Sequence, residues 1–386
     1  MDTIYNKVMK ELPSDKLNVR NDIVYEINSQ TPFTGNEVQH YDTGEILFRG
    51  CYKDGQQEGE SISYYFSGQW NIKVNYKKGQ LNGPYEQYYE NGQIEHKYTY
   101  KNGVLDGLYE SYYENGQLLI KQNYKNKLLD GPYEMHYENG QLESKGTYKN
   151  GAHDGPSESY YENGQLKEKS TYKNGIKDGP YESYHDNGQL RYKATFKNDE
   201  TDGSFEWYNE NGQLERKGIF KNGKRDGSFE WYNENGQLGG KSTYKNGKKE
   251  GPFETYYENG LLQEKGTQIA LVEKSTSRFR VIDEGKLDGP YEMHYENGQL
   301  KEKSTYKNGV KDGPWESYNK NGHLELKGTY KNDKRDGSWE NYYENGQLIS
   351  KNTYKNGKRD GSFEWYNENG QLKEKRTYKD GKLLPD

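Results

Sequence analysis

GPSESYYENGQLKEKSTYKNGIKD, residues 155–178, is one of fourteen copies of a 24-residue unit in this chain. A glycine opens each copy, every 24 residues from Gly35 to Gly251 and again from Gly289 to Gly361. With that glycine as position 0, the consensus reads G-P/S-Y/F-E-x-Y-Y-E-N-G-Q-L-x-x-K-x-T-Y-K-N-G-K-x-D. Self-similarity at a fixed period is the signature of a repeat protein, in which each unit contacts mainly its neighbours.

Each repeat has the pattern of one β-hairpin. Asn-Gly at positions 8 and 9, as in Asn163-Gly164, predicts a two-residue type I′ turn, because both residue types tolerate a positive φ. Aromatic and Thr-containing runs of strand length flank this turn, and the KNGKxDG segment predicts a second turn that closes the unit. A two-residue turn predicts that position 6 pairs with 11, 4 with 13, 3 with 14 and 2 with 15.

This register predicts two different faces for the sheet. One face carries the aromatic residues of positions 2, 6 and 17 and the Leu of position 11; the other carries Glu at 3, the basic residue at 14 and Tyr at 5. Position 14 is basic in all fourteen repeats and position 3 is Glu in twelve, so opposite charges are expected across the strands. Position 15 is often small, which leaves room for the ring at position 2. Where position 4 is Trp, position 6 is Asn, in the repeats of Trp207, Trp231 and Trp365.

The sequence therefore predicts an all-β fold. We expect an elongated antiparallel array of β-hairpins, a solenoid-like twisted ribbon, with a short N-terminal helix. The expected organisation is an N-terminal cap at 1–34, repeats one to ten at 35–267, an insertion at 268–284 and repeats eleven to fourteen at 285–386.

The cap is predicted from the apolar pattern before the first repeat. Asp2–Leu12 is predicted as the helix, ended by Pro13, and Asn18–Ile27 as a strand that leads into the array. Val38 and Ile62 replace Glu at position 3 in the first two repeats, so we expect the helix to cover them.

The insertion QIALVEKSTSRFRVIDE is fourteen residues longer than the three residues it replaces. Two β-rich pieces flank a Ser-Thr-Ser turn, which predicts an extra hairpin or an extended loop. It is either a tolerated insertion at a turn, whose apolar residues extend the sheet, or a recognition loop. Arg278, Phe279 and Arg280 combine an aromatic ring with two cations, a mixture favoured at binding hot spots. These three residues are the candidate partner-binding residues of the insertion.

Composition narrows the classes of protein further. Only 29% of the residues are hydrophobic but 15% are aromatic, which favours a thin aromatic core over disorder. Cys51 is the only cysteine, so no intrachain disulfide is possible. The net charge of −6 argues against nucleic-acid binding. The sequence shows neither a secretory signal nor a run of the ~18 apolar residues that a membrane span needs, so the expected location is the cytoplasm.

The pattern does not favour an enzyme. The seven histidines are scattered or replace strand tyrosines, and the acidic residues are cross-strand partners or turn formers. No phosphate-binding glycine loop or calcium-loop spacing is present. We therefore expect no catalytic residue, no metal site and no cofactor.

Tyrosine at position 5 is the repeated candidate for partner binding. It lies on the predicted charged face, where rings among Glu and Lys suit a contact surface, although a strand-stabilising role explains it as well. The candidates selected from this series are Tyr208, Tyr232, Tyr256 and Tyr318.

The unit YYENGQLxxKxTYKNGKxDGPYE strongly resembles the variant MORN repeat, and the chain as a whole is similar to the YwqK-like antitoxin family of bacteria. NDIVYEINSQTPFTG, residues 21–35, resembles the entry strand of that family. The resemblance covers 18–385 except the insertion. It implies an antitoxin or immunity protein that neutralises a toxin by direct contact, and it transfers no catalytic residue, because the motif defines structural Gly and aromatic positions.

Three binding functions follow. The leading hypothesis is a protein-binding module, with the toxin-neutralising antitoxin as its specific form. The second is a membrane-peripheral scaffold, although Glu residues match the basic residues and leave no polybasic stripe for anionic lipid. The third is a surface module that contacts host proteins or glycans, which ranks lower because the sequence shows no secretion signal.

Overall fold

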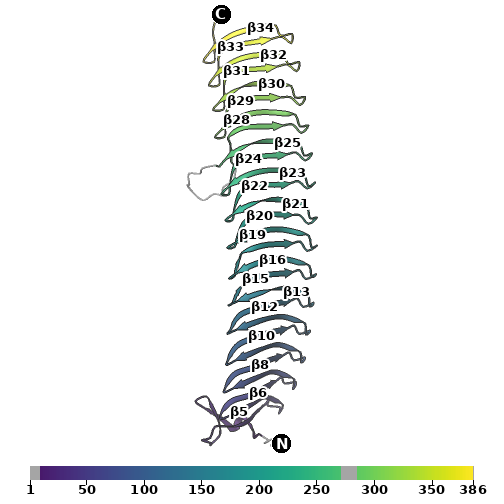
Figure 1. Cartoon of the computed structure of the whole chain (residues 1–386), viewed down its shortest axis with the longest axis vertical. Coiled ribbons are helices and arrows are strands. Elements are labelled where there is room, and N and C mark those ends of the chain that lie inside the picture. The colour runs from purple at the N-terminus through teal and green to yellow at the C-terminus, as the bar shows by residue number, and fades with distance from the viewer. Residues whose placement is uncertain (1–8, 271–284, 386) are drawn as a thin grey trace. The chain divides into compact units, whose positions relative to one another are not determined.

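The computed structural model describes residues 9–270 and 285–385 (Figure 1). The chain divides into two compact units, Met1–Gln189 and Leu190–Asp386. Among the described residues the secondary structure consists of 35 β-strands and one three-residue 3-10 helix, so the predicted all-β class is confirmed. Of these strands, 33 belong to the hairpin ladder, which follows chain order within each unit; its pairing is antiparallel except that β1 pairs parallel with β4.

The first unit begins with short elements and continues with hairpins. The short elements are β1 (Glu11–Pro13), η1 (Ser14–Lys16), β2 (Leu17–Arg20) and β3 (Ile23–Glu26). The hairpin strands are β4 (Gly35–His40), β5 (Ile46–Lys53), β6 (Gln56–Tyr64), β7 (Trp70–Lys77), β8 (Gln80–Tyr88), β9 (Ile94–Lys101), β10 (Val104–Tyr112), β11 (Leu118–Lys125), β12 (Leu128–His136), β13 (Leu142–Lys149), β14 (Ala152–His153), β15 (Gly155–Tyr160), β16 (Leu166–Lys173), β17 (Ile176–Lys177) and β18 (Gly179–Tyr184).

The second unit consists of hairpin strands throughout its described part. They are β19 (Leu190–Lys197), β20 (Glu200–Tyr208), β21 (Leu214–Lys221), β22 (Lys224–Tyr232), β23 (Leu238–Lys245), β24 (Lys248–Tyr256), β25 (Leu262–Ile269), β26 (Lys286–Leu287), β27 (Gly289–His294), β28 (Leu300–Lys307), β29 (Val310–Tyr318), β30 (Leu324–Lys331), β31 (Lys334–Tyr342), β32 (Leu348–Lys355), β33 (Lys358–Tyr366), β34 (Leu372–Lys379) and β35 (Lys382–Leu383).

The turn at Asn-Gly differs from the prediction. In the hairpin β8–β9 the Tyr89 carbonyl accepts the Gly92 N–H at 2.9 Å, and Gly92, not Asn91, has a positive φ of +88°. This is a type I turn closed by a glycine in the left-handed region, with three loop residues instead of two. Tyr88 consequently pairs with Ile94, so the predicted pairing of position 6 with 11 is wrong.

A β-bulge next to this turn restores the predicted register. Beyond the bulge Glu86 pairs with Lys97 and Tyr85 with Tyr98, which confirms the pairings of 3 with 14 and 2 with 15. The type I′ turn occurs at the other end of the repeat, where Asn102 and Gly103 have φ of +52° and +75°. Each repeat therefore uses two different turns.

The same register continues from one repeat to the next. Lys97 pairs with Glu86 of its own hairpin and with Glu110 of the following one. Position 14 thus lies between two glutamates of position 3, and the charges alternate along one face of each unit. Lys145 shows the result, since its Nζ lies 2.9 Å from the Glu158 carboxylate.

The opposite face holds the thin core of each unit. Small residues at position 15 allow the rings of position 2 to lie flat against the strand, as predicted. A Cβ built on Gly218 would lie 2.7 Å from the Phe229 ring, and one on Gly328 would lie 2.3 Å from the Trp339 ring. Trp339 and Phe363 are each only 1% exposed.

The N-terminal prediction of a helix is wrong where it can be compared. Residues 1–8 lie outside the described part of the chain, but Glu11–Pro13 form β1, which pairs parallel with β4. Pro13 lies opposite Val38, which is 3% exposed, so a short strand and not a helix borders this apolar residue. Pro13 supplies no N–H for a helix, and the edge of β4 offers unpaired backbone groups instead.

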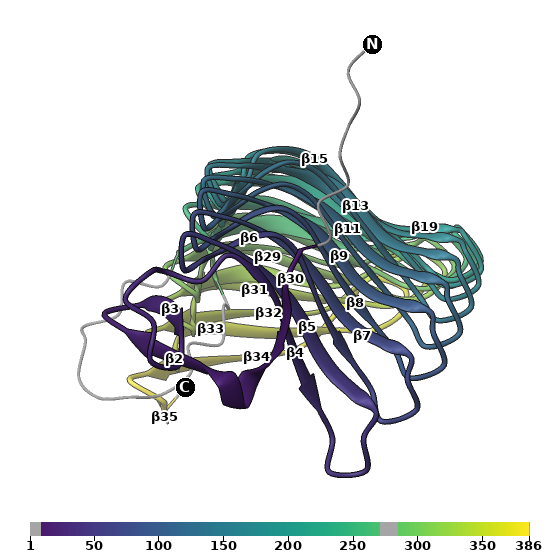
Figure 2. The same ribbon diagram turned by 90° about the horizontal axis from the view of Figure 1, so that it is seen from below.

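The predicted strand at Asn18–Ile27 is a hairpin. Leu17–Arg20 and Ile23–Glu26 form a separate two-stranded sheet around Asn21 and Asp22, both of which have positive φ. Figure 2 shows this β2–β3 hairpin beside the first hairpins of the array. The Val24 N–H donates to the Gly55 carbonyl at 2.9 Å, which joins the cap to the turn that follows β5.

The ladder continues on both sides of the insertion. Gln268 pairs with Leu287 and Ile269 with Lys286, the pairing that other repeats show around the type I′ turn. Residues 271–284 lie outside the described part of the chain.

Candidate functional site

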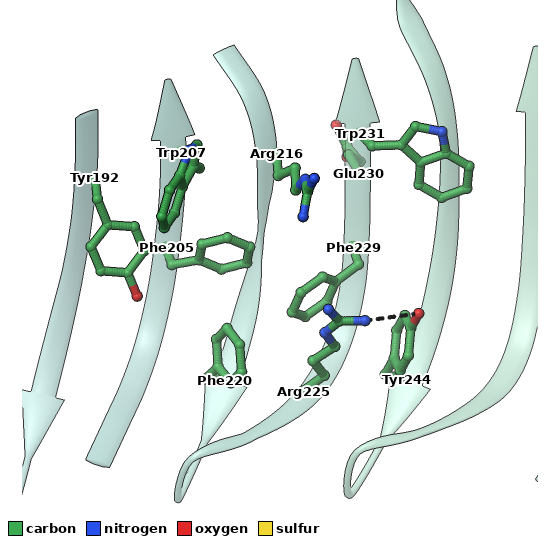
Figure 3. Close-up of a pocket in the computed structure, with 10 residues that line it drawn as sticks. All are labelled: Tyr192, Phe205, Trp207, Arg216, Phe220, Arg225, Phe229, Glu230, Trp231 and Tyr244. Atoms are coloured by element: carbon green, nitrogen blue, oxygen red, sulfur yellow. Dashed lines mark hydrogen bonds between the residues drawn. The ribbon is translucent and has the colours of Figure 1, made fainter. Parts of the chain in front are cut away.

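A groove on the aromatic face of the second unit is the candidate binding site. It lies over β19–β23 and has a volume of about 370 Å³ (Figure 3). Ten residues line it: Tyr192, Phe205, Trp207, Arg216, Phe220, Arg225, Phe229, Glu230, Trp231 and Tyr244. We call it the Trp–Arg groove. A volume in this range suits one or two side chains or a small molecule.

The floor of the groove is a packed group of rings. Phe205 and Phe229, both at position 2, have ring centroids 5.2 Å apart, and Phe220 lies 5.2 Å and 5.4 Å from them. Tyr244 continues the row at 5.1 Å from Phe229. Phe205, Phe229 and Tyr244 belong to one buried cluster with Ala194, so the floor is fixed by packing.

Two indoles and a guanidinium form the other side of the groove. Trp207 pairs across the strands with Arg216, and Arg216 pairs with Trp231, so the three side chains lie in one cross-strand row. Figure 3 shows Arg216 between the two indoles. Trp207 is 36% exposed, and Arg216 is exposed as well. Hot-spot side chains therefore face solvent next to an apolar floor.

A pair of glycines makes room for the second indole. Trp231 pairs with Gly240, and a Cβ on Gly240 would lie 2.2 Å from the Trp231 Cζ2. A Cβ on Gly239 would lie 2.9 Å from the Cδ1 of the same ring. All other repeats carry side chains at both positions, so the Gly-Gly step is what lets Trp231 lie against the strand.

The two arginines of repeat 8 replace an ion pair found in other repeats. In repeat 6 the position-22 Lys177 lies 3.0 Å from the position-13 Glu168, and in repeat 11 Lys311 lies 2.7 Å from Glu302. Repeat 8 has Arg225 at position 22 and Arg216 at position 13. Within the described residues neither guanidinium has a carboxylate within ion-pair distance. The groove therefore carries two cations without a carboxylate partner in the described part of the chain.

Aromatic rings hold Arg225 in place. Its Cζ lies 4.8 Å from the Phe229 ring centroid and 5.2 Å from that of Tyr244, and its Nη1 donates to the Tyr244 hydroxyl at 3.2 Å. Stacking of this kind stabilises a guanidinium without removing its charge.

Glu230 also borders the groove, but its side chain lies on the charged face and has its own partners there. Its carboxylate accepts a hydrogen bond from the Tyr232 hydroxyl at 2.7 Å and lies 3.0 Å from the Lys217 Nζ. Burial would raise the pKa of Glu230, but these two hydrogen bonds outweigh it and lower that pKa. Glu230 stays ionised and engaged on the charged face.

The candidate tyrosines of position 5 lie on that charged face, as predicted. Each is half-buried, and its hydroxyl donates to the Glu two residues earlier, at 2.8 Å in Tyr208, 2.7 Å in Tyr232 and 2.6 Å in Tyr318, with the same contact in Tyr256. Burial and the neighbouring carboxylate raise the pKa of Tyr208, Tyr256 and Tyr318 to about 12. These contacts fix the rings within the Glu–Lys ladder, and a partner role for them stays a prediction.

The remaining predicted site residues belong to the insertion. Arg278, Phe279 and Arg280 lie outside the described residues. Sequence reasoning noted Trp207 and Trp231 as strand residues and did not recognise the site. The signal that could have found it is the coincidence of Trp at position 4 in consecutive repeats with Arg at 13 and 22 and a Gly-Gly step.

The described residues contain no cluster of three or more His, Cys, Asp or Glu side chains suited to a metal ion. No described helix has the length and apolar character to cross a membrane.

Comparisons with solved structures give distant likenesses. "Crystal Structure of TcdB2-TccC3" is 11% identical over 93% of this chain and 21% of that chain, with a TM-score of 0.17. A Tc holotoxin pore of Photorhabdus luminescens is 12% identical over 91% of this chain and 22% of that chain, also with a TM-score of 0.17. The chain spans about a fifth of the length of these structures. No curated protein matches it.

The match to a protein family is direct. The model of the MORN repeat variant matches residues 81–102, 105–126, 129–150, 154–174, 177–198, 201–222, 225–246, 249–268, 287–308, 311–332, 335–356 and 359–380. The matched segments follow the period of the hairpins and cover well over half of the chain. The chain therefore belongs to the MORN repeat variant family, as a repeat protein suited to binding.

Proposed function

We propose that this protein is a non-catalytic binding protein that contacts another protein through the Trp–Arg groove. The supporting observation is the row of Trp207, Arg216 and Trp231 beside a packed aromatic floor. Trp, Tyr and Arg are the residues enriched at the energetic centres of protein interfaces. A regular array presents the same groups at every step, so recognition of one partner needs a place where the repeats differ, and the groove is such a place.

Toxin neutralisation is the specific form of binding that we propose. The repeats resemble those of an antitoxin family, and occlusion of a toxin requires a contact surface without a reactive group. The rigid floor favours this role, since a surface that is ordered before binding loses little conformational entropy on association.

Co-expression tests this proposal. The product of each gene adjacent to this one is expressed alone and together with the full chain, and growth and complex formation are measured. We expect one neighbour to arrest growth when alone, to be harmless with this chain, and to co-purify with it. The variant Trp207→Ala/Trp231→Ala should weaken the purified complex by at least about thirtyfold, because even one hot-spot truncation costs about 2 kcal/mol or more.

Ile219→Ala provides the matched control. Ile219 is 47% exposed in the same repeat as Trp207 and lies at position 16, on the opposite face of the sheet. Its substitution should leave the complex unchanged. Rescue of growth by the groove variant as complete as that by the wild-type chain would contradict the assignment of the groove.

A further inference from the structure

The charge of the Trp–Arg groove indicates what it binds. We propose that the groove recognises an extended peptide segment of the partner in which acidic residues alternate with an aromatic one; this rests on the proposed function and names the chemistry of the partner.

The aromatic part of such a segment matches the floor. Phe205, Phe220 and Phe229 offer ring faces and edges at 5.2–5.4 Å from one another, the spacing at which aromatic side chains pack. A further ring placed on this floor would be flanked by Trp207 and would bury apolar surface on both sides. One aromatic side chain fits the available volume of about 370 Å³.

The acidic part matches the two guanidiniums. Arg216 and Arg225 have no carboxylate partner among the described residues, whereas lysines of the same face in repeats 6 and 11 do. Glu215 and Glu234 line an adjoining groove with Arg216, and neither lies within ion-pair distance of it. A carboxylate that approaches Arg216 meets a planar donor between two indoles, where partial exclusion of water strengthens the contact.

The alternation follows from strand geometry. In an extended chain successive side chains point to opposite sides, so residues i, i+2 and i+4 face the same surface. A segment that places its aromatic ring on the floor then directs the residues two before and two after it toward the same face of the groove. Acidic residues at those two positions can reach guanidiniums on either side of the ring.

Single-stranded nucleic acid is the competing occupant, since bases also stack on aromatic rings beside arginine. The net charge of −6 disfavours a polyanion that must track a long surface. A short acidic segment needs only the two local cations. The experiment therefore includes a nucleic-acid probe, so that binding of nucleic acid would be detected.

The test uses the full chain labelled with fluorinated tryptophan. Loss of a resonance in Trp207→Phe and in Trp231→Phe assigns the two indole signals. The probes are acetyl-Glu-Ser-Phe-Ser-Glu-amide, its Gln and Lys counterparts, and a thymidine pentanucleotide. We expect the Glu peptide to shift both assigned signals at about 1 mM or below, and the Gln and Lys peptides to bind at least about tenfold more weakly, the loss expected for one charge-assisted hydrogen bond.

Variants locate the charge. Arg216→Gln should weaken the Glu peptide about tenfold, and Arg216→Lys should restore only part of the affinity, because Lys lacks the planar fork. Arg335→Gln is the control, since Arg335 stacks on Trp339 with its Cζ 4.3 Å from the ring, outside the groove. It should leave binding unchanged. The melting temperature of each variant shows whether it is folded.

Three results would overturn the inference: equal binding of the Glu and Gln peptides, tighter binding of the pentanucleotide, or no shift of the assigned signals by any probe. The outcomes for inference and function are separable. If a partner protein binds and Arg216→Gln does not weaken it, the acidic-segment inference fails and the binding function stands. If no partner protein is found, the proposed binding function is contradicted. The peptide titration then still tests whether the groove prefers an acidic segment.

Discussion

Trp231 and Gly240 face each other across β22 and β23, and the indole occupies the space where any other residue at 240 would place its Cβ, 2.2 Å from Cζ2. We expect Gly240→Ala to displace the indole, to lower the free energy of unfolding by about 1–3 kcal/mol through overpacking, and to weaken partner binding. Ser350→Ala, at the same position of repeat 13, is the control and should change stability by less. Urea unfolding measures both, and a fully stable Gly240→Ala protein would refute the contact.

Position 15 gives a second prediction about packing. A Cβ on Gly328 would lie 2.3 Å from the Trp339 ring, so Gly328→Ala should destabilise by about 1–3 kcal/mol. At the same position of repeat 11, Ser304 is 2% exposed and its hydroxyl lacks a hydrogen-bond partner. Ser304→Ala removes that unpaired group and should be neutral or stabilising. The melting temperature should therefore fall in Gly328→Ala and stay the same or rise in Ser304→Ala. An equal fall in both variants would argue against this packing.

Replacement of a histidine by tyrosine at position 5 should increase the stability of the fold. Tyrosines there donate to the Glu of position 3, but His294 and His136 occupy this position with an Nδ1 that is buried without a partner. His294→Tyr should restore the hydrogen bond to Glu292 and stabilise by about 1 kcal/mol. His40→Tyr is the matched control, because position 3 of its repeat is Val38 and offers no acceptor. If the two substitutions give the same change in melting temperature, the Tyr–Glu contact contributes nothing.

The charge ladder predicts how stability depends on pH. Glu340 accepts a hydrogen bond from Tyr342 at 2.5 Å and lies 2.9 Å from Lys327 and 3.1 Å from Lys351. The Tyr342 hydroxyl and then the two lysines lower the pKa of Glu340 from 4.5 to about 2. The folded-state pKa is depressed, so the carboxylate stabilises the fold above pH 4.5 and this contribution is lost as the pH falls toward 2.

The comparison with Glu340→Gln measures that contribution. The variant should melt below the wild-type chain at about pH 6, and the difference should shrink as the pH is lowered to about 3. We expect a difference of about 1 kcal/mol at neutral pH, since the ladder is partly exposed to solvent. A difference that stays constant between these pH values would show that Glu340 does not act through its charge.

The register was predictable because its determinants are local and repeated. Glu at position 3 and Lys at position 14 identify the cross-strand pair whatever the turn. The turn prediction was wrong, since Gly92 takes the left-handed conformation alone and adds a loop residue, yet the bulge before Tyr88 compensates by one residue. The extra loop residue and the bulge each shift the strand pairing by one residue, in opposite directions. Glu86 therefore still pairs with Lys97, as predicted.

The ends and the groove were less predictable for physical reasons. A helical pattern at the N-terminus competes with the open edge of β4, and only the folded array shows that β1 pairs there. The groove is formed by substitutions in the repeat consensus on three neighbouring strands. Each substitution taken alone gives no sign of a binding site. Arg216 follows Trp207 by nine residues and precedes Trp231 by fifteen, and their proximity becomes evident only when the strands are paired.

Site-specific photocrosslinking in the native host tests the central claim most directly. A photoreactive phenylalanine analogue is placed in the full chain at residue 207, in the groove, or at residue 219, on the opposite face of the same repeat. We predict one abundant crosslinked protein at residue 207, reduced in yield by Arg216→Gln, and none at residue 219. Equal crosslinking at both residues, or crosslinks at residue 219 alone, would contradict a binding function centred on the Trp–Arg groove.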